Sequence, residues 1–190
     1  MNKLEPNAFY VEGPNPGVPL TVAIALTTYS EPPDTDSGRH KFNWTEIGSV
    51  LHDAKYGSLR EISRTAARDK LTELLLEMAT TNAHLRGARA VVAVPGSDHD
   101  LSEVLAKDIA FGLDVPFVVA RRRSIGGVPA KWRGSAKREY DITESLEGPV
   151  LIVDDFFRTG DSMRGVAMAA VRAGATECRG IVVAYTPPPA

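Results

Sequence analysis

The chain has 190 residues, and its 22 Lys and Arg against 24 Asp and Glu give a formal net charge of -2. The length suits one α/β domain, and the balanced charge excludes a general attraction to nucleic acid or to an anionic membrane. No apolar stretch approaches the about 20 residues that cross a bilayer, and the polar start lacks a signal-peptide core, so we expect a cytoplasmic protein with no membrane partner. The single cysteine, Cys178, excludes an internal disulfide and is expected in the core.

The first part of the chain predicts a small β element. Residues 21–26 form an apolar run typical of a strand, and residues 31–41 form a polar loop with Pro and Gly. We therefore expect an accessory β element over residues 1–45, followed by a core over residues 46–190 within one structural domain.

Strand and helix patterns alternate through the rest of the chain. Buried strands are predicted over 90–94, 115–120, 150–153 and 179–185. Helices are predicted over 62–84, with an inward stripe of Leu71, Leu74, Leu75 and Met78, and over 101–111, with Leu101, Val104, Leu105 and Ile109 inward. This alternation predicts an α/β fold, a doubly wound and mostly parallel sheet with helices on both faces.

Residues 150–162 carry the strongest functional signal. Four apolar residues predict a strand buried on both faces, and Asp154 and Asp155 follow at its carboxyl end. A helix with its apolar residues in phase begins at Ser162, just after Gly160, which lets the backbone turn and approach a ligand. The amides at such a helix start favour a phosphate. The combination therefore predicts a site for a phosphorylated sugar, although two acids alone are common as solvated strand ends.

This stretch resembles the 5-phosphoribosyl-1-pyrophosphate (PRPP) signature of the type I phosphoribosyltransferases, which has four apolar residues, two acids, two apolar residues and a Thr-Gly loop. The resemblance implies catalytic and ribose-binding roles for Asp154 and Asp155, which would hold the ribose hydroxyls directly or through Mg²⁺ and water. It also implies 5′-phosphate binding by the loop Arg158, Thr159, Gly160, Asp161 and Ser162. Arg158 departs from the usual Thr or acid, and we expect at least one of Phe156 and Phe157 to be core.

The resemblance covers roughly residues 50 to 185 and is nearest to the ComF-like subgroup, through the stretch 52–57 and through Val94-Pro95. It implies that Pro95, Gly96 and Ser97 form the pyrophosphate loop. The next residues, 98–100, are Asp, His and Asp in place of the family's usual cations. We interpret Asp100 and Glu103 as a helix capping box, in preference to a metal site at 98–100.

Residues 121–138 contain seven basic residues and no acid, with two adjacent glycines and a tryptophan. In the family, the corresponding segment is flexible and closes over the PRPP phosphates, and here it would contribute Arg123, Lys131, Arg133 and Lys137. A solvated surface loop and a contact with nucleic acid are the alternatives left open.

Together these features predict a phosphoribosyltransferase that uses PRPP and Mg²⁺ to transfer the phosphoribosyl group to a nitrogenous acceptor, with release of pyrophosphate. No residue identifies that acceptor, and a homodimer stays open. The alternative is a PRPP- or nucleotide-sensing regulator, or a nucleic-acid-linked protein like those of competence, without turnover.

Overall fold

The computed structural model describes residues 9–12, 19–29, 45–57, 61–96, 100–123 and 139–186. The strands are β1 (Phe9–Glu12), β2 (Leu20–Thr28), β3 (Ala90–Ala93), β4 (Phe117–Val119), β5 (Arg121–Arg122), β6 (Tyr140–Asp141), β7 (Gly148–Phe157) and β8 (Ala175–Tyr185). The helices are α1 (Glu46–Tyr56), α2 (Glu61–Thr81), α3 (Leu101–Leu113) and α4 (Asp161–Arg172). None of these helices is long and apolar enough to cross a membrane.

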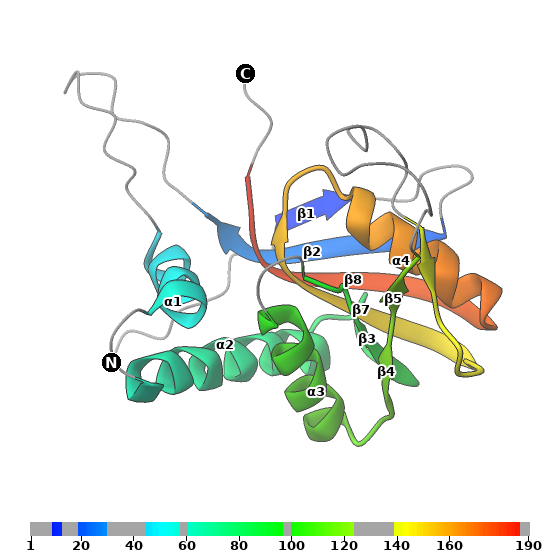
Figure 1. Ribbon diagram of the computed structural model, residues 1–190, viewed down its shortest axis with the longest axis horizontal. Helices are drawn as coiled ribbons and strands as arrows, with labels where there is room; N and C mark the ends of the chain where they lie inside the picture. Colours follow the sequence, from blue (N-terminus) through cyan, green and yellow to red (C-terminus); the bar gives the residue numbers. More distant parts are fainter. Residues whose placement is uncertain are drawn as a thin grey trace.

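Six strands form the main sheet in the order β1-β2-β8-β7-β3-β4 (Figure 1). The five strands from β2 to β4 are parallel, whereas β1 runs antiparallel to β2 at the edge. The N-terminal β pair therefore extends the main sheet, because β2 also pairs with β8. The predicted doubly wound, mostly parallel sheet is confirmed.

Helices cover both faces of the sheet because successive residues of each central strand point to opposite sides. Val91, Leu151 and Ile181 pack with α1, α2 and α3 in one core. Their neighbours in sequence, Val92, Ile152 and Val182, pack with α4 in the other. Figure 1 accordingly shows α4 on one side of the sheet and α2 and α3 on the other.

The predicted inward residues agree with the structure except at one position. The α2 stripe and Cys178 are buried, and so are Leu101, Leu105 and Ile109 of α3. Val104 is only half-buried, whereas Ser102 is buried. The buried stripe of α3 thus includes Ser102, and this hydroxyl faces the end of β7.

Two strands are longer than the apolar runs that predicted them. β7 extends beyond the predicted run 150–153 to Phe157, and β8 begins at Ala175, before the predicted run 179–185. They pair with each other from Gly148 opposite Ala175 to Phe157 opposite Tyr185, and this pairing keeps both chains extended. Asp154 and Asp155 consequently lie inside β7.

α1 has no counterpart among the predicted helices. Its residues Ile47, Leu51 and Ala54 are buried at helical spacing in the core shared with α2, and its start is tied to the end of β2. Thr45 is its N-cap, accepting a hydrogen bond from Gly48 N at 3.0 Å and donating one to Thr28 O at 2.8 Å. Gly48 lies so close to β2 that an added Cβ would collide with the Tyr29 carbonyl oxygen. The missing side chain therefore sets the position of α1.

We expect Gly48→Ala to destabilise the protein by about 1–3 kcal/mol, because the backbone of β2 cannot yield to the new methyl group. A loss of stability would be informative, because replacing glycine with alanine inside a helix normally stabilises the helix by up to about 1 kcal/mol. Urea unfolding of both proteins measures the difference.

Gly112→Ala is the matched control, because it also replaces a helix glycine. Its new Cβ would meet only the end of the Leu76 side chain, 2.6 Å from Cδ2, and that side chain can rotate away. If Gly48→Ala proves as stable as Gly112→Ala, the close packing of α1 on β2 is not required.

Candidate functional site

The site residues predicted from the sequence lie where the direction of chain winding reverses. β3 and β7 are neighbours in the sheet, but the helices that follow them, α3 and α4, pack on opposite faces. The carboxyl ends of two such strands leave room between the two departing connections, which is where open α/β sheets bind ligands. The β3–β7 pairing ends at Ala93 opposite Val153, so the acid pair begins one residue further on.

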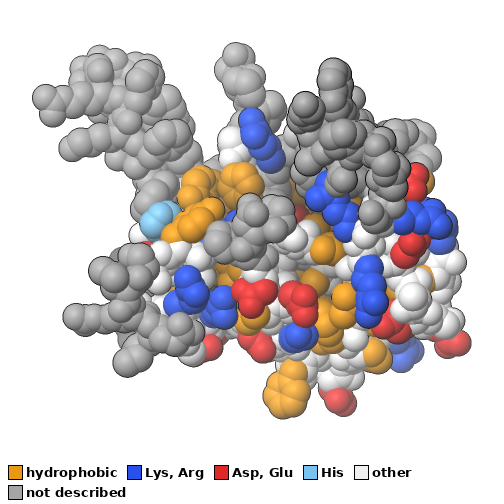
Figure 2. Space-filling model, viewed as in Figure 1, with side chains coloured by type: hydrophobic (Ala, Val, Ile, Leu, Met, Phe, Trp, Pro, Cys, Tyr) orange, Lys and Arg blue, Asp and Glu red, His pale blue; other side chains and the backbone are white. Residues whose placement is uncertain are grey.

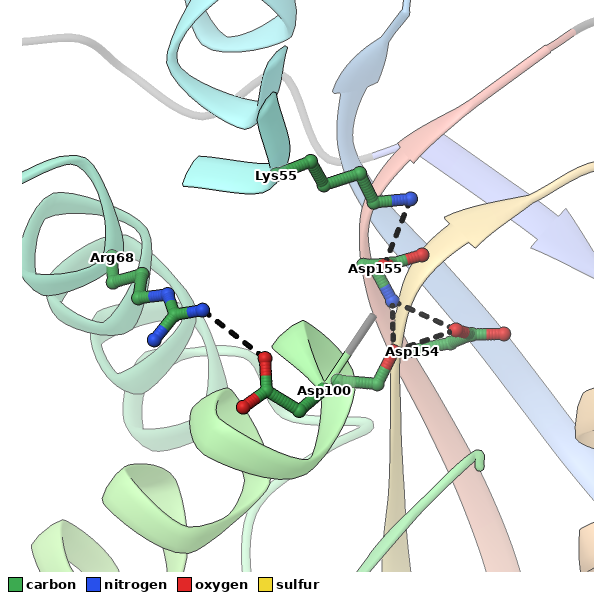
Figure 3. Close-up of polar contacts among 6 residues, drawn as sticks. Lys55, Arg68, Asp100, Asp154 and Asp155 are labelled. Carbon is green, nitrogen blue, oxygen red and sulfur yellow. Dashed lines mark hydrogen bonds and ion pairs between the residues drawn. The ribbon is translucent and has the colours of Figure 1, made fainter. Parts of the chain in front are cut away.

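Asp154 is held in one orientation by two donors. Ser102 Oγ donates to Asp154 Oδ1 at 3.1 Å, and the Asp155 amide donates to the same oxygen at 2.8 Å. The Asp155 amide also lies 3.2 Å from Ser102 Oγ. The first turn of α3 and the end of β7 thus fix this carboxyl group together (Figure 3).

Burial, and after it the neighbouring Asp155 carboxylate, raise the pKa of the Asp154 carboxyl from 3.8 to a net value of about 7. The hydrogen bonds from Asp155 and Ser102 and the charge of Lys55 lower the pKa, but burial outweighs them. Asp154 can therefore take up and release a proton near neutral pH, as acids in functional sites often do.

Asp155 is paired with a cation that the sequence reading did not assign to the site. Lys55 Nζ of α1 lies 2.9 Å from Asp155 Oδ2, and the side chains of Lys55 and Asp155 are only 18% and 14% exposed. Figure 3 shows the Lys55 side chain extending from α1 to the end of β7. Lys55 belongs to the stretch 52–57 that resembles the ComF-like subgroup, which was the available signal, but only the docking of α1 reveals its partner.

The two phenylalanines after the acid pair differ in their surroundings. Phe157 is buried in the α4 core, which agrees with the expectation that at least one of the two is core. Phe156 is half-buried. The centres of the Phe156 and Tyr29 rings lie 5.2 Å apart in an edge-to-face arrangement, and Lys55 Nζ lies 5.9 Å from the centre of the Phe156 ring. Phe156 thus supports the Lys55 side chain beside Asp155.

The predicted phosphate loop leads directly into α4. Gly160 is the N-cap, with φ of 76°, a conformation that side chains disfavour, so the glycine is required by the turn. Thr159 Oγ1 donates to Asp161 Oδ2 at 2.9 Å, and Arg164 Nη1 lies 3.2 Å from Asp161 Oδ1. Arg158, the first residue of the loop, is exposed. The Arg164 guanidinium offsets the negative charge of Asp161 near the helix start, where amides favour an anion.

The proposed pyrophosphate loop is only partly described, since Pro95 and Gly96 are resolved in the structure and Ser97, Asp98 and His99 lie outside the described residues. The predicted capping box after it is wrong. Asp100 is the N-cap of α3 but makes no side-chain cap hydrogen bond.

The two acids of the predicted capping box, Asp100 and Glu103, form ion pairs with basic side chains. Asp100 Oδ1 lies 3.1 Å from Nη2 of Arg68 on α2 (Figure 3), and Glu103 pairs with Lys107 at 2.8 Å. Asp100 thus pairs with a residue of α2, and the predicted hydrogen bond to the start of α3 does not form. This ion pair turns the Asp100 carboxylate toward Arg68 of α2.

Only the start of the basic segment is described. Arg121, Arg122 and Arg123 are exposed, and Arg123 lies 3.5 Å from Glu139 and 3.1 Å from Asp141 at the β5–β6 pair. Lys131, Arg133 and Lys137 lie outside the described residues. Among the described residues, Figure 2 shows acidic and basic side chains interspersed over the face in view.

The acid pair has suitable chemistry for Mg²⁺. Among the described residues no three His, Cys, Asp or Glu side chains form a metal-binding group. Mg²⁺, however, is commonly held by one or two carboxylates together with substrate oxygens. Asp154 is the better ligand of the two, because Lys55 already contacts Asp155 Oδ2.

Comparison with known proteins gives structural matches only. No family model and no curated protein matches the chain. Adenine phosphoribosyltransferase from Leishmania tarentolae has a TM-score of 0.50 at 14% identity, over 74% of this chain and 88% of that one. Orotate phosphoribosyltransferase from Aeropyrum pernix has a TM-score of 0.48 at 19% identity, over 77% of this chain and 69% of that one.

A third similar structure is adenine phosphoribosyltransferase from Thermoanaerobacter pseudethanolicus, with a TM-score of 0.47 and 23% identity over 80% of each chain. At such identities the likeness concerns the fold alone. The chain has the fold of the type I phosphoribosyltransferases, whereas the nearness to the ComF-like subgroup stays a prediction.

We expect Asp154→Asn to be more stable than the wild type at neutral pH. The unfolded chain loses this proton near the ordinary pKa of 3.8, whereas the folded chain keeps it to about pH 7, so wild-type stability falls as the pH rises through that window. Asparagine cannot ionise, and its Oδ1 can accept both hydrogen bonds. Allowing for partial exposure, the gain is roughly 1–3 kcal/mol near pH 8 and smaller near pH 5.

Urea unfolding at several pH values measures this difference. Asp69→Asn, which neutralises an exposed acid on α2, is the control and should leave the pH dependence of the wild type unchanged. A constant difference between Asp154→Asn and the wild type at all pH values would show that burial does not hold the proton on Asp154.

Proposed function

We propose that this protein is a phosphoribosyltransferase, which uses PRPP and Mg²⁺ to transfer a phosphoribosyl group to a nitrogenous acceptor. The observation that carries the proposal is the placement of Asp154 and Asp155 at the winding reversal, next to the 158–162 loop that begins α4. The fold shared with adenine phosphoribosyltransferase supports it.

The roles follow from the chemistry of each group. The Asp154 and Asp155 carboxylates would accept hydrogen bonds from the ribose 2′- and 3′-hydroxyls, and the loop 158–162 would bind the 5′-phosphate through its amides. Mg²⁺ supplies charge neutralisation for the pyrophosphate group when it is bound. Asp154 would be its carboxylate ligand, directly or through water.

In the transfer, the bond from the ribose C1 to the pyrophosphate oxygen breaks and a bond from C1 to the acceptor nitrogen forms. The bonding electrons leave with pyrophosphate, and the sugar ring becomes positively charged in the transition state. Carboxylates held beside the ring stabilise that charge, and the anchored phosphate fixes the ring against the acceptor. Arg123 and the basic residues after it would neutralise the departing pyrophosphate.

PRPP or nucleotide sensing without turnover is a second candidate function. The observation that favours it lies in the pyrophosphate region, where Pro95 and Gly96 carry no cation and Arg68 is engaged with Asp100. A protein that binds the sugar phosphate but holds pyrophosphate weakly would sense the ligand without transferring it.

Calorimetric titration with PRPP and Mg²⁺, followed by a screen of nucleobases for pyrophosphate release, tests the proposal. We expect the wild type to bind PRPP, and Asp154→Asn with Asp155→Asn to bind it at least about a hundredfold more weakly, because two charged acceptors of the ribose are lost. The double variant should still unfold cooperatively. Unchanged affinity in the folded double variant would contradict the ribose assignment, and binding without release of pyrophosphate from any base would favour the sensor.

Gly160→Val tests the phosphate position separately. A β-branched residue is strained at a φ of 76°, so the loop would move and its amides would no longer converge. We expect binding of ribose 5-phosphate, measured by calorimetry, to weaken at least about tenfold.

Gly87→Val provides the control for backbone strain. Gly87 has a similar φ of 84°, and an added Cβ there would meet nothing within 4 Å. It should lose stability and keep its affinity for ribose 5-phosphate. Equal affinities in the two variants would mean that the phosphate binds elsewhere.

A further inference from the structure

The ion pair between Lys55 and Asp155 has no role in the function proposed above. Its 2.9 Å contact joins α1 to the end of β7, and both side chains are largely shielded from water. The pair occupies Oδ2 of one of the two carboxylates that the ribose would contact. A cation at that position changes what else the carboxylate can hold.

Several contacts keep Lys55 in this place. Thr45 and Gly48 fix the start of α1 against β2, and Phe156 lies beside the lysine ammonium. At the other end of the helix, Arg64 of α2 donates to the Lys55 carbonyl oxygen at 3.4 Å. Because backbone and side chain are both held, the ammonium is a fixed charge of the site and differs from a mobile surface lysine.

A fixed ammonium on Asp155 opposes a metal ion at the same carboxylate. The two cations would repel each other across a few ångströms in a partly shielded site, where charges interact more strongly than in water. The lysine already cancels the carboxylate charge, so Asp155 attracts Mg²⁺ less than an unpaired acid would. Its other oxygen, Oδ1, can still accept a hydrogen bond from a sugar hydroxyl.

We propose that Lys55 is the built-in counter-cation of the ribose site, so that this protein binds a ribose 5-phosphate group without a metal ion on Asp155. The inference rests on the proposed function and deepens it, because it divides the site into two parts. The ribose part is neutralised by the chain itself, and only the pyrophosphate of PRPP requires Mg²⁺. Lys55 is a positioning residue, acting through Asp155.

Calorimetric titration with ribose 5-phosphate, which lacks the pyrophosphate, tests this inference in excess EDTA and in excess MgCl₂. The wild type should bind with the same affinity in both conditions, within about twofold. Lys55→Met keeps the apolar stem beside Phe156 but leaves Asp155 without its cation. Its affinity in EDTA should fall at least about tenfold and should recover in MgCl₂, because the metal then takes the place of the lysine.

Thermal unfolding with MgCl₂ alone gives a second readout that needs no sugar. Mg²⁺ should raise the midpoint of Lys55→Met and leave that of the wild type unchanged, since only the variant has an uncompensated carboxylate. Lys55→Arg should behave like the wild type in both assays. Lys55→Gln, whose amide can still donate to Asp155, takes the place of Lys55→Met if that variant does not fold.

Lys107→Met is the matched control. Lys107 also lies over an aromatic ring, 5.5 Å from the centre of Phe117, and pairs with Glu103, but it lies on the exposed side of α3. It should change neither assay. Wild-type binding that requires Mg²⁺, or tight binding by Lys55→Met in EDTA, would overturn the inference and leave the proposed function standing. No binding of ribose 5-phosphate by the wild type in either condition would overturn both.

Discussion

Two consecutive carboxyl groups at the end of a central parallel strand, partly shielded from water, are the constraint on which the site depends. Two adjacent charges in such a place are costly, because burial disfavours each and each repels the other. The two carboxyl groups are stabilised in different ways. Ser102 and the backbone orient Asp154, whose pKa is raised, while Lys55 neutralises Asp155 directly. The site therefore carries less negative charge than its sequence suggests, which suits a ligand that is itself anionic.

These partners come from both sides of the acid pair in the sequence. Lys55 lies on α1, Ser102 lies in the first turn of α3, and the 158–162 loop leads into α4. The parallel sheet brings them together because its crossover connections carry the chain back to the start of each strand, so that the carboxyl ends of the parallel strands collect at one edge. A small residue far from the ligand can then matter for binding. Gly48, for example, sets how closely α1 approaches β2 and hence where Lys55 stands.

The sheet and most of its core could be predicted from the sequence, because apolar runs and helical phasing reflect local patterning. The acid pair and the 158–162 loop could be placed for the same reason, since they are contiguous. α1 was not predicted, because it is short and its few buried apolar residues, Ile47, Leu51 and Ala54, find their partners only in the core shared with α2 and α3. The predicted capping bond of Asp100 was also wrong, because its carboxylate pairs instead with Arg68, 32 positions away in sequence. Contacts between distant segments compete with local rules, and the sequence alone does not show which will win.

This distinction also explains why the proposed ribose and phosphate parts of the site are better defined than the proposed pyrophosphate part. The acids and the loop of the first two lie in one contiguous stretch, residues 154–162, although Ser102 and Lys55 complete the acid pair from other helices. The third depends on side chains that pair across elements, as Arg68 does with Asp100 and Arg123 with Glu139 and Asp141. For pyrophosphate to draw on Arg68 or Arg123, it must compete with carboxylates that already hold them. If the chain binds PRPP as proposed, its affinity for the leaving group would therefore depend on how easily these pairs exchange partners, and its affinity for the sugar phosphate on groups already in place.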